Sequence, residues 1–219
     1  MKVILGKNLL SANAEQAAWN RNLFRRNRTA VVNLISSPGS GKTTLLEKTA
    51  GQLGSKIKIG VIVGDLYTDR DARRLEEAGA GAVQINTGGL CHLNAGMVAR
   101  ALEELEPPSP ELLFIENVGN LVCPAAFDLG EQVKVALLSV AEGSDKPAKY
   151  PGIFMAAAVT VISKADLLPH TDFDLPGCIE EISEINGPLG VFVVSARTGQ
   201  GLDEWCRWLE KLVEAAGKD

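Results

Sequence analysis

The sequence predicts an α/β fold in which a doubly wound, mainly parallel sheet carries helices on both faces. From Thr29 onwards, short β-branched runs alternate with polar helical stretches, and a glycine-rich loop joins the first run to a helix. Most runs are apolar at consecutive positions, which is typical of parallel strands that are covered on both faces. The alternation of such strands with helices gives the doubly wound arrangement.

The composition agrees with a single globular domain. The chain has 219 residues, of which 46% are hydrophobic and 22% are charged. A formal net charge of −5 has the wrong sign for a surface that binds nucleic acid. The apolar runs 31–35 and 153–162 are too short to span a membrane, and residues 1–5 are too short for a signal peptide. We therefore expect a cytoplasmic protein with no nucleic-acid or membrane partner.

The first predicted element is an amphipathic helix over Ser11–Arg28, which Ser11 can cap. We treat residues 1–28 as an N-terminal helical extension and residues 29–219 as the main domain. The apolar side of the helix carries Ala14, Ala17, Ala18 and Leu23. The arginines near its end are Arg21, Arg25, Arg26 and Arg28. Positive charge suits the negative end of a helix dipole, so we interpret this cluster as a solvated helix end, with a docking surface as the alternative.

Seven strands and five helices are predicted after this extension. The strands lie at Val31–Ser36, Lys58–Gly64, Ala82–Ile85, Leu112–Glu116, Val133–Val140, Thr160–Ser163 and Val191–Ser195. The helices lie at Lys42–Leu53, Asp69–Ala78, Asn94–Leu105, Cys178–Ile185 and Leu202–Ala215. In the last helix, Leu202, Trp205, Leu209 and Leu212 fall on one stripe, which predicts that the tryptophan belongs to the core. Prolines between residues 107 and 110 indicate a rigid loop before a strand.

The first strand leads into a phosphate loop, defined here as residues 36–43 (SSPGSGKT). A strand before this pattern and a helix after it are the context in which it binds phosphate. Gly39 and Gly41 let backbone N–H groups turn towards the β-phosphate, while Lys42 places a cation against the β- and γ-phosphates. The hydroxyl of Thr43 can bind Mg²⁺. The pattern usually begins with glycine, and Ser36 departs from it. The expected nucleotide contacts are Gly39, Ser40, Gly41, Lys42, Thr43 and Thr44.

Two acidic residues close predicted strands at the edge of the sheet where the phosphates would lie. Asp65 follows the second strand and could hold a metal-bound water or orient the attacking one. Glu116 ends the fourth strand in the position of a Walker B acid, and Gly119 follows where a glycine senses the γ-phosphate. Asp69 and Asp71 begin a helix and are interpreted as caps. The predicted catalytic residues are Lys42, Asp65 and Glu116, and the predicted Mg²⁺ site is Thr43, Asp65 and Glu116.

The segment Ser163-Lys164-Ala165-Asp166 after the sixth strand predicts a guanine site. The carboxylate of Asp166 can accept from N1–H and the 2-amino group of guanine, a pair that adenine lacks, and the stem of Lys164 can lie over the ring. The segment resembles the guanine-reading motif Asn-Lys-x-Asp. Serine in place of asparagine loses a contact that ties the loop down, so we expect weaker nucleotide affinity by about 1 kcal/mol. Ser195-Ala196 resembles the backbone contact to the guanine carbonyl, and GTP is favoured over ATP.

Two cysteines and a histidine form a candidate site for a soft metal ion. Cys91-His92 follows the third strand and a Gly-Gly turn, and Cys123 lies seven residues after the end of the fourth strand. Two thiolates and an imidazole suit Zn²⁺ or Ni²⁺. The alternative is that these thiols are buried as small hydrophobic groups, as free cysteines commonly are. Cys178 and Cys206 lie inside predicted helices and are expected to be inert packing residues.

These motifs together resemble the HypB family, the GTPases that assist nickel insertion during the maturation of nickel–iron hydrogenases. The resemblance runs from about residue 15 to the C-terminus. It rests on the phosphate loop, Gly64-Asp65, Asn86-Thr87-Gly88, Cys91-His92-Leu93, the segment 116–124 (ENVGNLVCP) and the segment 150–153 (YPGI). Residues 116–123 are its most specific part, because the related urease accessory GTPase differs there.

The resemblance implies a P-loop NTPase of the SIMIBI class, which groups signal recognition particle and MinD-like proteins. It implies slow hydrolysis of GTP to GDP and phosphate with Mg²⁺, and a homodimer when GTP is bound. Cys91, His92 and Cys123 would bind nickel or zinc near the dimer interface. The implied partners are a HypA-type nickel-insertion protein and the hydrogenase large-subunit precursor. Because the first cysteine is Cys91, we expect neither the N-terminal nickel motif nor the His-rich tract of some members.

We hypothesise that GTP and Mg²⁺ organise the segments of Asp65 and Glu116, and that movement near Gly119 repositions Cys123 relative to Cys91 and His92. Four alternatives stay open. The chain could be a P-loop phosphotransferase with bystander thiols, or a GTPase with a purely structural zinc. It could also be a urease-accessory-type or other metallochaperone GTPase, or a chaperone for a cobalamin enzyme.

Overall fold

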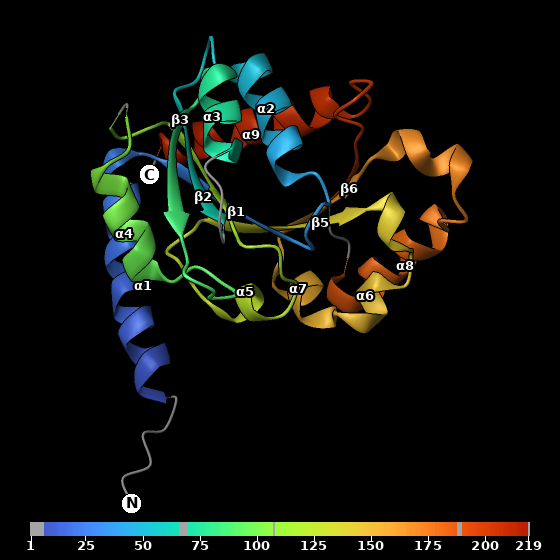
Figure 1. Ribbon diagram of the computed structural model, residues 1–219, viewed down its shortest axis with the longest axis horizontal. Coiled ribbons are helices and arrows are strands. Elements are labelled where there is room, and N and C mark those ends of the chain that lie inside the picture. Colours follow the sequence, from blue (N-terminus) through green and yellow to red (C-terminus); the bar gives the residue numbers. More distant parts are fainter. Residues whose placement is uncertain (1–6, 66–69, 107, 188–189, 219) are drawn as a thin grey trace, which may run out of the picture.

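The computed structural model describes residues 7–65, 70–106, 108–187 and 190–218 (Figure 1). Within these residues, seven strands form one sheet in the order β3-β2-β4-β1-β5-β6-β7, and every neighbouring pair is parallel. The strands are β1 (Ala30–Ser36), β2 (Ile59–Asp65), β3 (Gly81–Asn86), β4 (Leu112–Glu116), β5 (Val133–Ser139), β6 (Val159–Ser163) and β7 (Gly190–Val193). The predicted doubly wound parallel sheet is confirmed.

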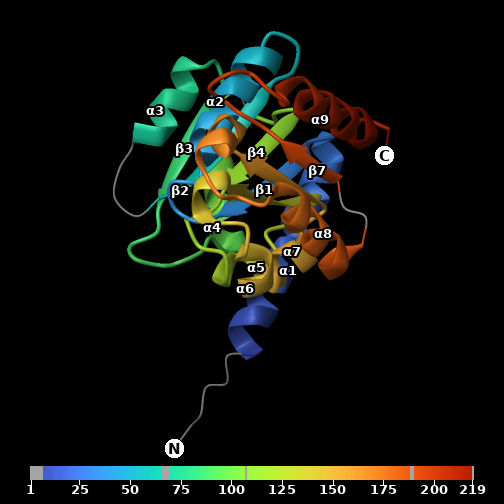
Figure 2. The ribbon, with the colours of Figure 1, turned by 90° about the vertical axis from the view of Figure 1, so that its right-hand side faces the viewer.

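Helices cover both faces of the sheet (Figures 1 and 2). One face packs against α2 (Lys42–Leu53), α3 (Arg70–Glu77) and α9 (Leu202–Ala216). The other face packs against α1 (Lys7–Asn27), α4 (Ala95–Glu103), α7 (Pro151–Ala156) and α8 (Leu175–Asn186). Shorter elements complete the described chain: α5 (Cys123–Ala126), α6 (Lys146–Lys149) and the 3₁₀ helices η1 (Val140–Glu142) and η2 (Ala165–His170).

The predicted long elements agree with the observed ones to within a few residues, and the differences have local causes. The last strand ends at Val193 instead of Ser195, because the chain turns and Ser195 N–H donates to the carbonyl of Gln200. The short helices α5 to α7 were not predicted. Of the two acids predicted to cap a helix, Asp69 lies outside the described residues, and Asp71 lies in the first turn of α3. Leu202, Trp205 and Leu209 are buried as predicted.

The prediction for the first helix is wrong in two respects. The helix α1 begins at Lys7, so Ser11 lies inside it and does not cap its start. Its buried stripe includes Ala17, Asn20 and Phe24, whereas Ala14 and Ala18, expected on the apolar side, are exposed. Because asparagine counts as polar in a hydropathy pattern, the predicted apolar side of the helix did not include the buried Asn20. The buried face of α1 was therefore predicted in the wrong place.

A buried asparagine of α1 holds this helix to neighbouring segments of the same chain. Asn20, fully buried, donates from Nδ2 to the carbonyls of Ala95 and Leu129, both at 2.9 Å. One of the predicted helix-end arginines, Arg21, pairs instead with Asp128 at 2.7 Å. The others, Arg25, Arg26 and Arg28, are exposed. Within the described residues, no helix has the length and apolar character needed to cross a membrane.

Candidate nucleotide and metal sites

The phosphate loop emerges at the middle of the sheet, because β1 lies between β4 and β5. At the carboxyl ends of the strands, a cavity of about 450 Å³ is bounded by this loop, by Asp65 and Glu116 at the ends of β2 and β4, and by Arg74 and Lys164. Gly39 and Gly41 have φ angles of 73° and 94°, a region that glycine adopts without strain. The predicted acids therefore lie beside the predicted phosphate loop.

The side chain of Lys42 is buried at the base of this cavity. Its Nζ donates to the hydroxyl of Ser36 at 2.9 Å, so the residue that departs from the usual glycine contacts the phosphate-loop lysine. Burial lowers the pKa of Lys42, and the nearby carboxylate of Glu116 opposes that shift. The ammonium is therefore buried against one hydroxyl partner and near a carboxylate, and its burial is the largest influence on its pKa.

Glu116 and Thr43 form the predicted Mg²⁺ site together with Asp65. The hydroxyl of Thr43 donates to Glu116 Oε1 at 2.9 Å. Burial raises the pKa of Glu116 to about 7, and Lys42 works against this rise. Its second oxygen, Oε2, is buried and has no hydrogen-bond partner in the described part of the chain. A hydroxyl and carboxylates are the oxygen ligands that Mg²⁺ takes beside phosphates, so these residues fit the ion.

Gly119 packs directly on the phosphate loop. A Cβ atom added at Gly119 would lie 2.8 Å from Pro38 Cγ and 2.9 Å from Pro38 N and Cα. Contacts below 3.0 Å would force the loop or the segment to move. Residues 116–123, called the switch segment below, therefore join Glu116 at one end to Cys123 at the other and touch the phosphate loop between them.

Lys164 and Asp166 of the predicted guanine site line a second cavity of about 270 Å³, whereas Ser195 is fully buried and does not line it. Gly41 and Lys164 border both cavities. Lys164 has a φ of 57° and donates from Nζ to the carbonyl of Gly39 at 2.7 Å. The hydroxyl of Ser195 donates to Asp166 at 2.6 Å and, as the largest cause, lowers the pKa of that carboxyl group. Ala196 also lines the cavity.

The expectation that Ser163 lacks a contact that ties its loop down is wrong, whereas the expected weaker nucleotide affinity stays a prediction. The hydroxyl of Ser163 donates to the carbonyl of Ser40 in the phosphate loop at 2.7 Å. Serine is shorter than asparagine, but the phosphate loop lies close enough for a direct bond. The loop that carries Lys164 and Asp166 is thus fixed to the phosphate loop.

Two charged residues beside the phosphate loop were not predicted from the sequence. Glu142 accepts from the hydroxyl of Ser40 at 2.6 Å, and it forms a capping box with Ser139 at η1. The Ser-x-x-Glu spacing was the available signal. Arg74 donates to Thr44 Oγ1 at 3.2 Å and pairs with Glu47 at 2.6 Å, which places a guanidinium at the wall of the larger cavity.

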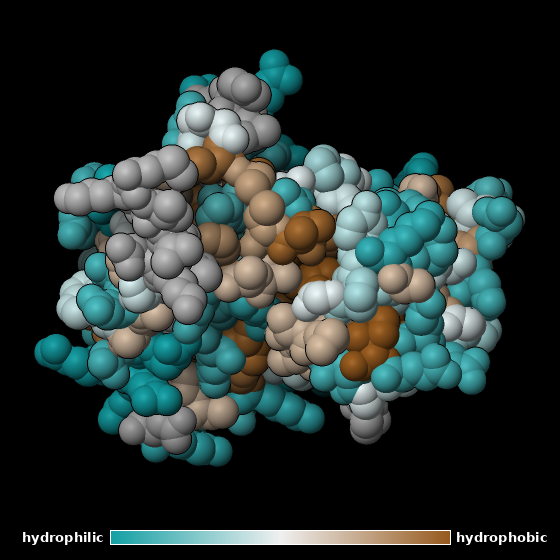
Figure 3. Space-filling model, turned by 90° about the horizontal axis from the view of Figure 1, so that it is seen from below, coloured by the Kyte–Doolittle hydropathy of each residue, from teal (hydrophilic) through white to brown (hydrophobic). Residues whose placement is uncertain are grey.

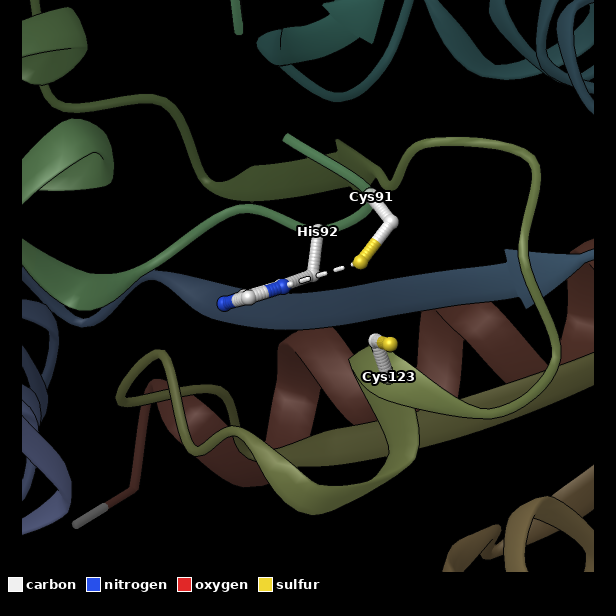
Figure 4. Close-up of side chains that lie close together, drawn as sticks. All are labelled: Cys91, His92 and Cys123. Carbon is white, nitrogen blue, oxygen red and sulfur yellow. Dashed lines mark hydrogen bonds between the residues drawn. The ribbon is translucent and has the colours of Figure 1, made fainter. Parts of the chain in front are cut away.

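The predicted metal ligands Cys91, His92 and Cys123 come together in one subunit (Figure 4). Their ligand atoms all lie within 4.8 Å of one another, and Cys91 Sγ is 3.6 Å from His92 Nδ1. Two ligands of one tetrahedral Zn²⁺ are roughly 3.5 Å apart, given bonds of about 2.0–2.3 Å. Small side-chain adjustments would therefore let one ion contact all three atoms. These residues are called the metal cluster below.

The surroundings of the metal cluster keep its imidazole in a state that can bind metal. The His92 ring stacks on Phe127, with centroids 3.8 Å apart and planes 27° from parallel. Burial lowers the pKa of His92, which favours the neutral ring. The buried Cys178 and Cys206 behave differently, because burial raises the pKa of their thiols to about 12 and about 11. The prediction that both are inert packing residues agrees with their burial.

Known proteins resemble this chain in sequence. The model of the family described as "CobW/HypB/UreG, nucleotide-binding domain" matches residues 30–192. The hydrogenase maturation factor HypB of Azotobacter chroococcum mcd 1 is 54% identical over 95% of this chain and 68% of that protein. The protein of the same name from Escherichia coli (strain K12) is 49% identical over 92% of this chain and 70% of its own length.

Solved structures resemble it as well. The crystal structure of HypB from Helicobacter pylori in complex with nickel has a TM-score of 0.87 and 38% identity, over 93% of this chain and 96% of that one. The signal recognition particle 54 kDa protein of Aeropyrum pernix K1, in complex with GDP, has a TM-score of 0.57 and 17% identity, over 87% of this chain and 48% of that one. This second likeness concerns the fold alone, and the predicted fold class is confirmed.

Proposed function

The chain belongs to the HypB family of hydrogenase maturation factors, and from this premise we propose that it is a GTPase that couples its nucleotide state to the delivery of nickel. The observation that carries the proposal is one continuous segment. Residues 116–123 begin with a phosphate-site carboxylate, pack on the phosphate loop at Gly119 and end with a metal-cluster thiol.

The guanine base would occupy the cavity lined by Lys164, Asp166 and Ala196. The carboxylate of Asp166, held by Ser195, would accept from N1–H and the 2-amino group of guanine. Adenine offers no such pair of donors, because its N1 is an acceptor. The proposal therefore includes selectivity for GTP over ATP.

Hydrolysis of GTP would take place where Lys42, Thr43 and Glu116 meet Asp65. Lys42 would exchange its bond to Ser36 for oxygens of the β- and γ-phosphates. Thr43, Asp65 and Glu116 would hold Mg²⁺, which would neutralise charge on the transferred phosphoryl group. Asp65, at the end of β2 in the same cavity, would orient the attacking water. Slow turnover is expected from the resemblance to the HypB family.

Nickel would be the cargo of the metal cluster, with zinc as an alternative occupant. Two thiolates and one imidazole leave a fourth position open on a tetrahedral or square-planar ion. A ligand from a partner could enter that position and take over the metal. The ligand set is therefore suited to handing an ion on.

We include in the proposal a GTP-dependent homodimer, a HypA-type partner and the hydrogenase large-subunit precursor as acceptor. Exposed apolar side chains next to the metal cluster support a protein partner, namely Leu90, 45% exposed, and Val122, 61% exposed. Met155 of α7 is also exposed, and hydrophobic side chains gather on the face that carries α5 to α7 (Figure 3).

The test of this function measures hydrolysis and metal binding on the same protein. We expect phosphate release from GTP and not from ATP, and one Ni²⁺ per subunit with a thiolate-to-nickel absorption band. Cys91→Ala and Cys123→Ala should lose that band and stay folded, while the matched control Cys206→Ala should keep it. Transfer of phosphate to an acceptor other than water would indicate a phosphotransferase. Unfolding of Cys91→Ala on metal loss would indicate a structural zinc.

A further inference from the structure

Leu93 directly follows the metal ligands Cys91 and His92 and is attached to the nucleotide site on two sides. Its side chain is fully buried against β2, so that a Cβ atom added at Gly64 would lie 2.9–3.0 Å from the branched end of Leu93. Its backbone N–H donates to Asn117 Oδ1 at 3.2 Å. Gly64 precedes Asp65 in the chain, and Asn117 follows Glu116. One leucine therefore touches the neighbours of both phosphate-site carboxylates.

Asn117 is the centre of a buried hydrogen-bond network. Its Oδ1 also accepts from the N–H of Val118 at 3.0 Å, in the switch segment itself. Its Nδ2 donates to Asn33 Oδ1 at 3.2 Å, and Asn33 in turn donates to Glu131 Oε1 at 3.0 Å. These donor and acceptor roles fix which way the amide of Asn117 faces. The residue is only 1% exposed, so these bonds are largely shielded from water.

We propose that Asn117 and Leu93 are positioning residues that transmit the nucleotide state to the Cys91-His92 half of the metal cluster. The proposal rests on the nickel-delivering GTPase function proposed above. A shift of Glu116 on nucleotide binding would move Asn117, and the shared Oδ1 would carry that shift to Leu93. The tight contact with Gly64 gives Leu93 a second link, to β2 and Asp65. A displacement of β2 would reach Leu93 through this contact, because a close-packed interior transmits displacement instead of absorbing it.

The contacts of Leu93 link Cys91 and His92 to the nucleotide site, and the switch segment links Cys123 to it. The switch segment carries Cys123 directly, whereas Cys91 and His92 belong to a different loop, between β3 and α4. The start of that loop is already tied to β2, because the N–H of Thr87 donates to the carbonyl of Asp65 at 3.1 Å, and the Leu93 contacts add a tie to Asn117, next to Glu116. With them, both halves of the metal cluster are attached to the residues that surround the phosphates.

The test compares Ni²⁺ affinity in the GDP state and in the state with a non-hydrolysable GTP analogue, both with Mg²⁺, by the thiolate-to-nickel absorption band. In the wild-type chain we expect the two dissociation constants to differ by about fivefold or more. Asn117→Ala removes the shared acceptor and should bring their ratio below about twofold. Leu93→Ala removes the contact with Gly64 without leaving a polar group unpaired, and should also reduce the ratio.

Leu105→Ala is the matched control. Leu105 belongs to the same buried cluster, and its side chain lies 2.8 Å from a Cβ added at Gly60 of the same strand, at the end away from the phosphates. It should destabilise the fold as much as Leu93→Ala yet keep the wild-type ratio, which separates coupling from stability.

Three outcomes overturn the inference. A wild-type ratio in both Asn117→Ala and Leu93→Ala refutes it directly and leaves the proposed function standing. If Asn117→Ala does not fold, the test rests on Leu93→Ala alone. A wild-type ratio of the two Ni²⁺ dissociation constants in that variant then overturns the inference. A ratio of one in the wild-type chain refutes the nucleotide gating in the proposed function, and the inference falls with it.

Discussion

At the scale of single residues, the chemistry of the nucleotide site is concentrated in one buried carboxyl group. Glu116 accepts from Thr43, faces the ammonium of Lys42 and leaves one oxygen without a partner in the described chain. Such an oxygen costs stability in the free protein and becomes useful when a cation binds. In the proposed Mg²⁺ site, Glu116 would therefore lose stability in the free protein and gain a use for this oxygen when the ion binds.

The first prediction concerns the pH dependence of stability at Glu116. Burial raises its folded pKa to about 7, from 4.5 for the ordinary group. Between these values the folded chain retains a proton that the unfolded chain has released, so its contribution to the free energy of unfolding falls as pH rises, by at most about 3 kcal/mol. Glu116→Gln removes this loss. Without nucleotide or metal, its stability relative to wild type should be higher at about pH 8 than at about pH 5.

Urea unfolding of wild type and Glu116→Gln at the two pH values measures this difference. The variant keeps an oxygen acceptor for Thr43, so the hydrogen bond itself is preserved. A stability difference that is the same at both pH values would show that Glu116 is not a buried titrating group.

At the scale of elements, two packing contacts are important. The switch segment packs on the phosphate loop, and α1 packs on the face of the sheet that it covers together with α4. Gly119 is the contact point of the first, because any side chain there meets Pro38. Asn20 is the contact point of the second, through two backbone carbonyls. In both cases one small or polar residue determines how two segments approach.

Gly119→Ala should weaken GTP binding by about tenfold or more. A Cβ at 2.8–2.9 Å from Pro38 displaces the phosphate loop, and a cost of about 1.4 kcal/mol suffices for a factor of ten. Titration with a fluorescent GTP analogue measures the affinity. The control is Gly51→Ala in α2, where an added Cβ has no neighbour within 4 Å, and it should bind like wild type. Equal GTP affinity of Gly119→Ala and wild type would show that the contact of Gly119 with Pro38 does not affect GTP binding.

Asn20→Ala should destabilise the fold by about 1–3 kcal/mol, since it leaves the carbonyls of Ala95 and Leu129 unpaired in the interior. Asn22→Ala on the exposed side of the same helix is the control and should change stability by less than about 0.5 kcal/mol. Thermal or urea unfolding of the two variants compares them. Equal stability of the two would mean that Asn20 does not hold α1 to the start of α4 and to the segment before β5.

The contrast between these elements explains what the sequence could and could not predict. The phosphate loop was predictable from Gly-Lys-Thr between a strand and a helix. The proximity of Cys91, His92 and Cys123 was predictable from their positions after strand ends together with the family resemblance. The face of α1 was not, because Asn20 contributes by hydrogen bonding while hydropathy counts it as solvent-exposed. The Ser163 bond to Ser40 and the Leu93 contact with Asn117 join residues far apart in sequence, and only coordinates reveal them.

At the scale of the whole molecule, one sheet edge brings together the cavity proposed for the phosphates, the cavity proposed for the base and the metal cluster. The central claim is that binding of nucleotide in the phosphate cavity is energetically coupled to binding of metal at the metal cluster. Coupling between two ligands is reciprocal, so any change in nickel affinity between nucleotide states must appear as the same factor in nucleotide preference with and without nickel. A tenfold factor corresponds to about 1.4 kcal/mol.

The most direct measurement is therefore a pair of reciprocal titrations on the wild-type chain with Mg²⁺. Nickel is titrated into the GDP state and into the state bound to a GTP analogue, and the preference between the two nucleotides is measured with and without nickel. We predict that nickel affinity differs between the states by about fivefold or more and that nucleotide preference changes by the same factor. Equal nickel affinities in the two states would contradict the account.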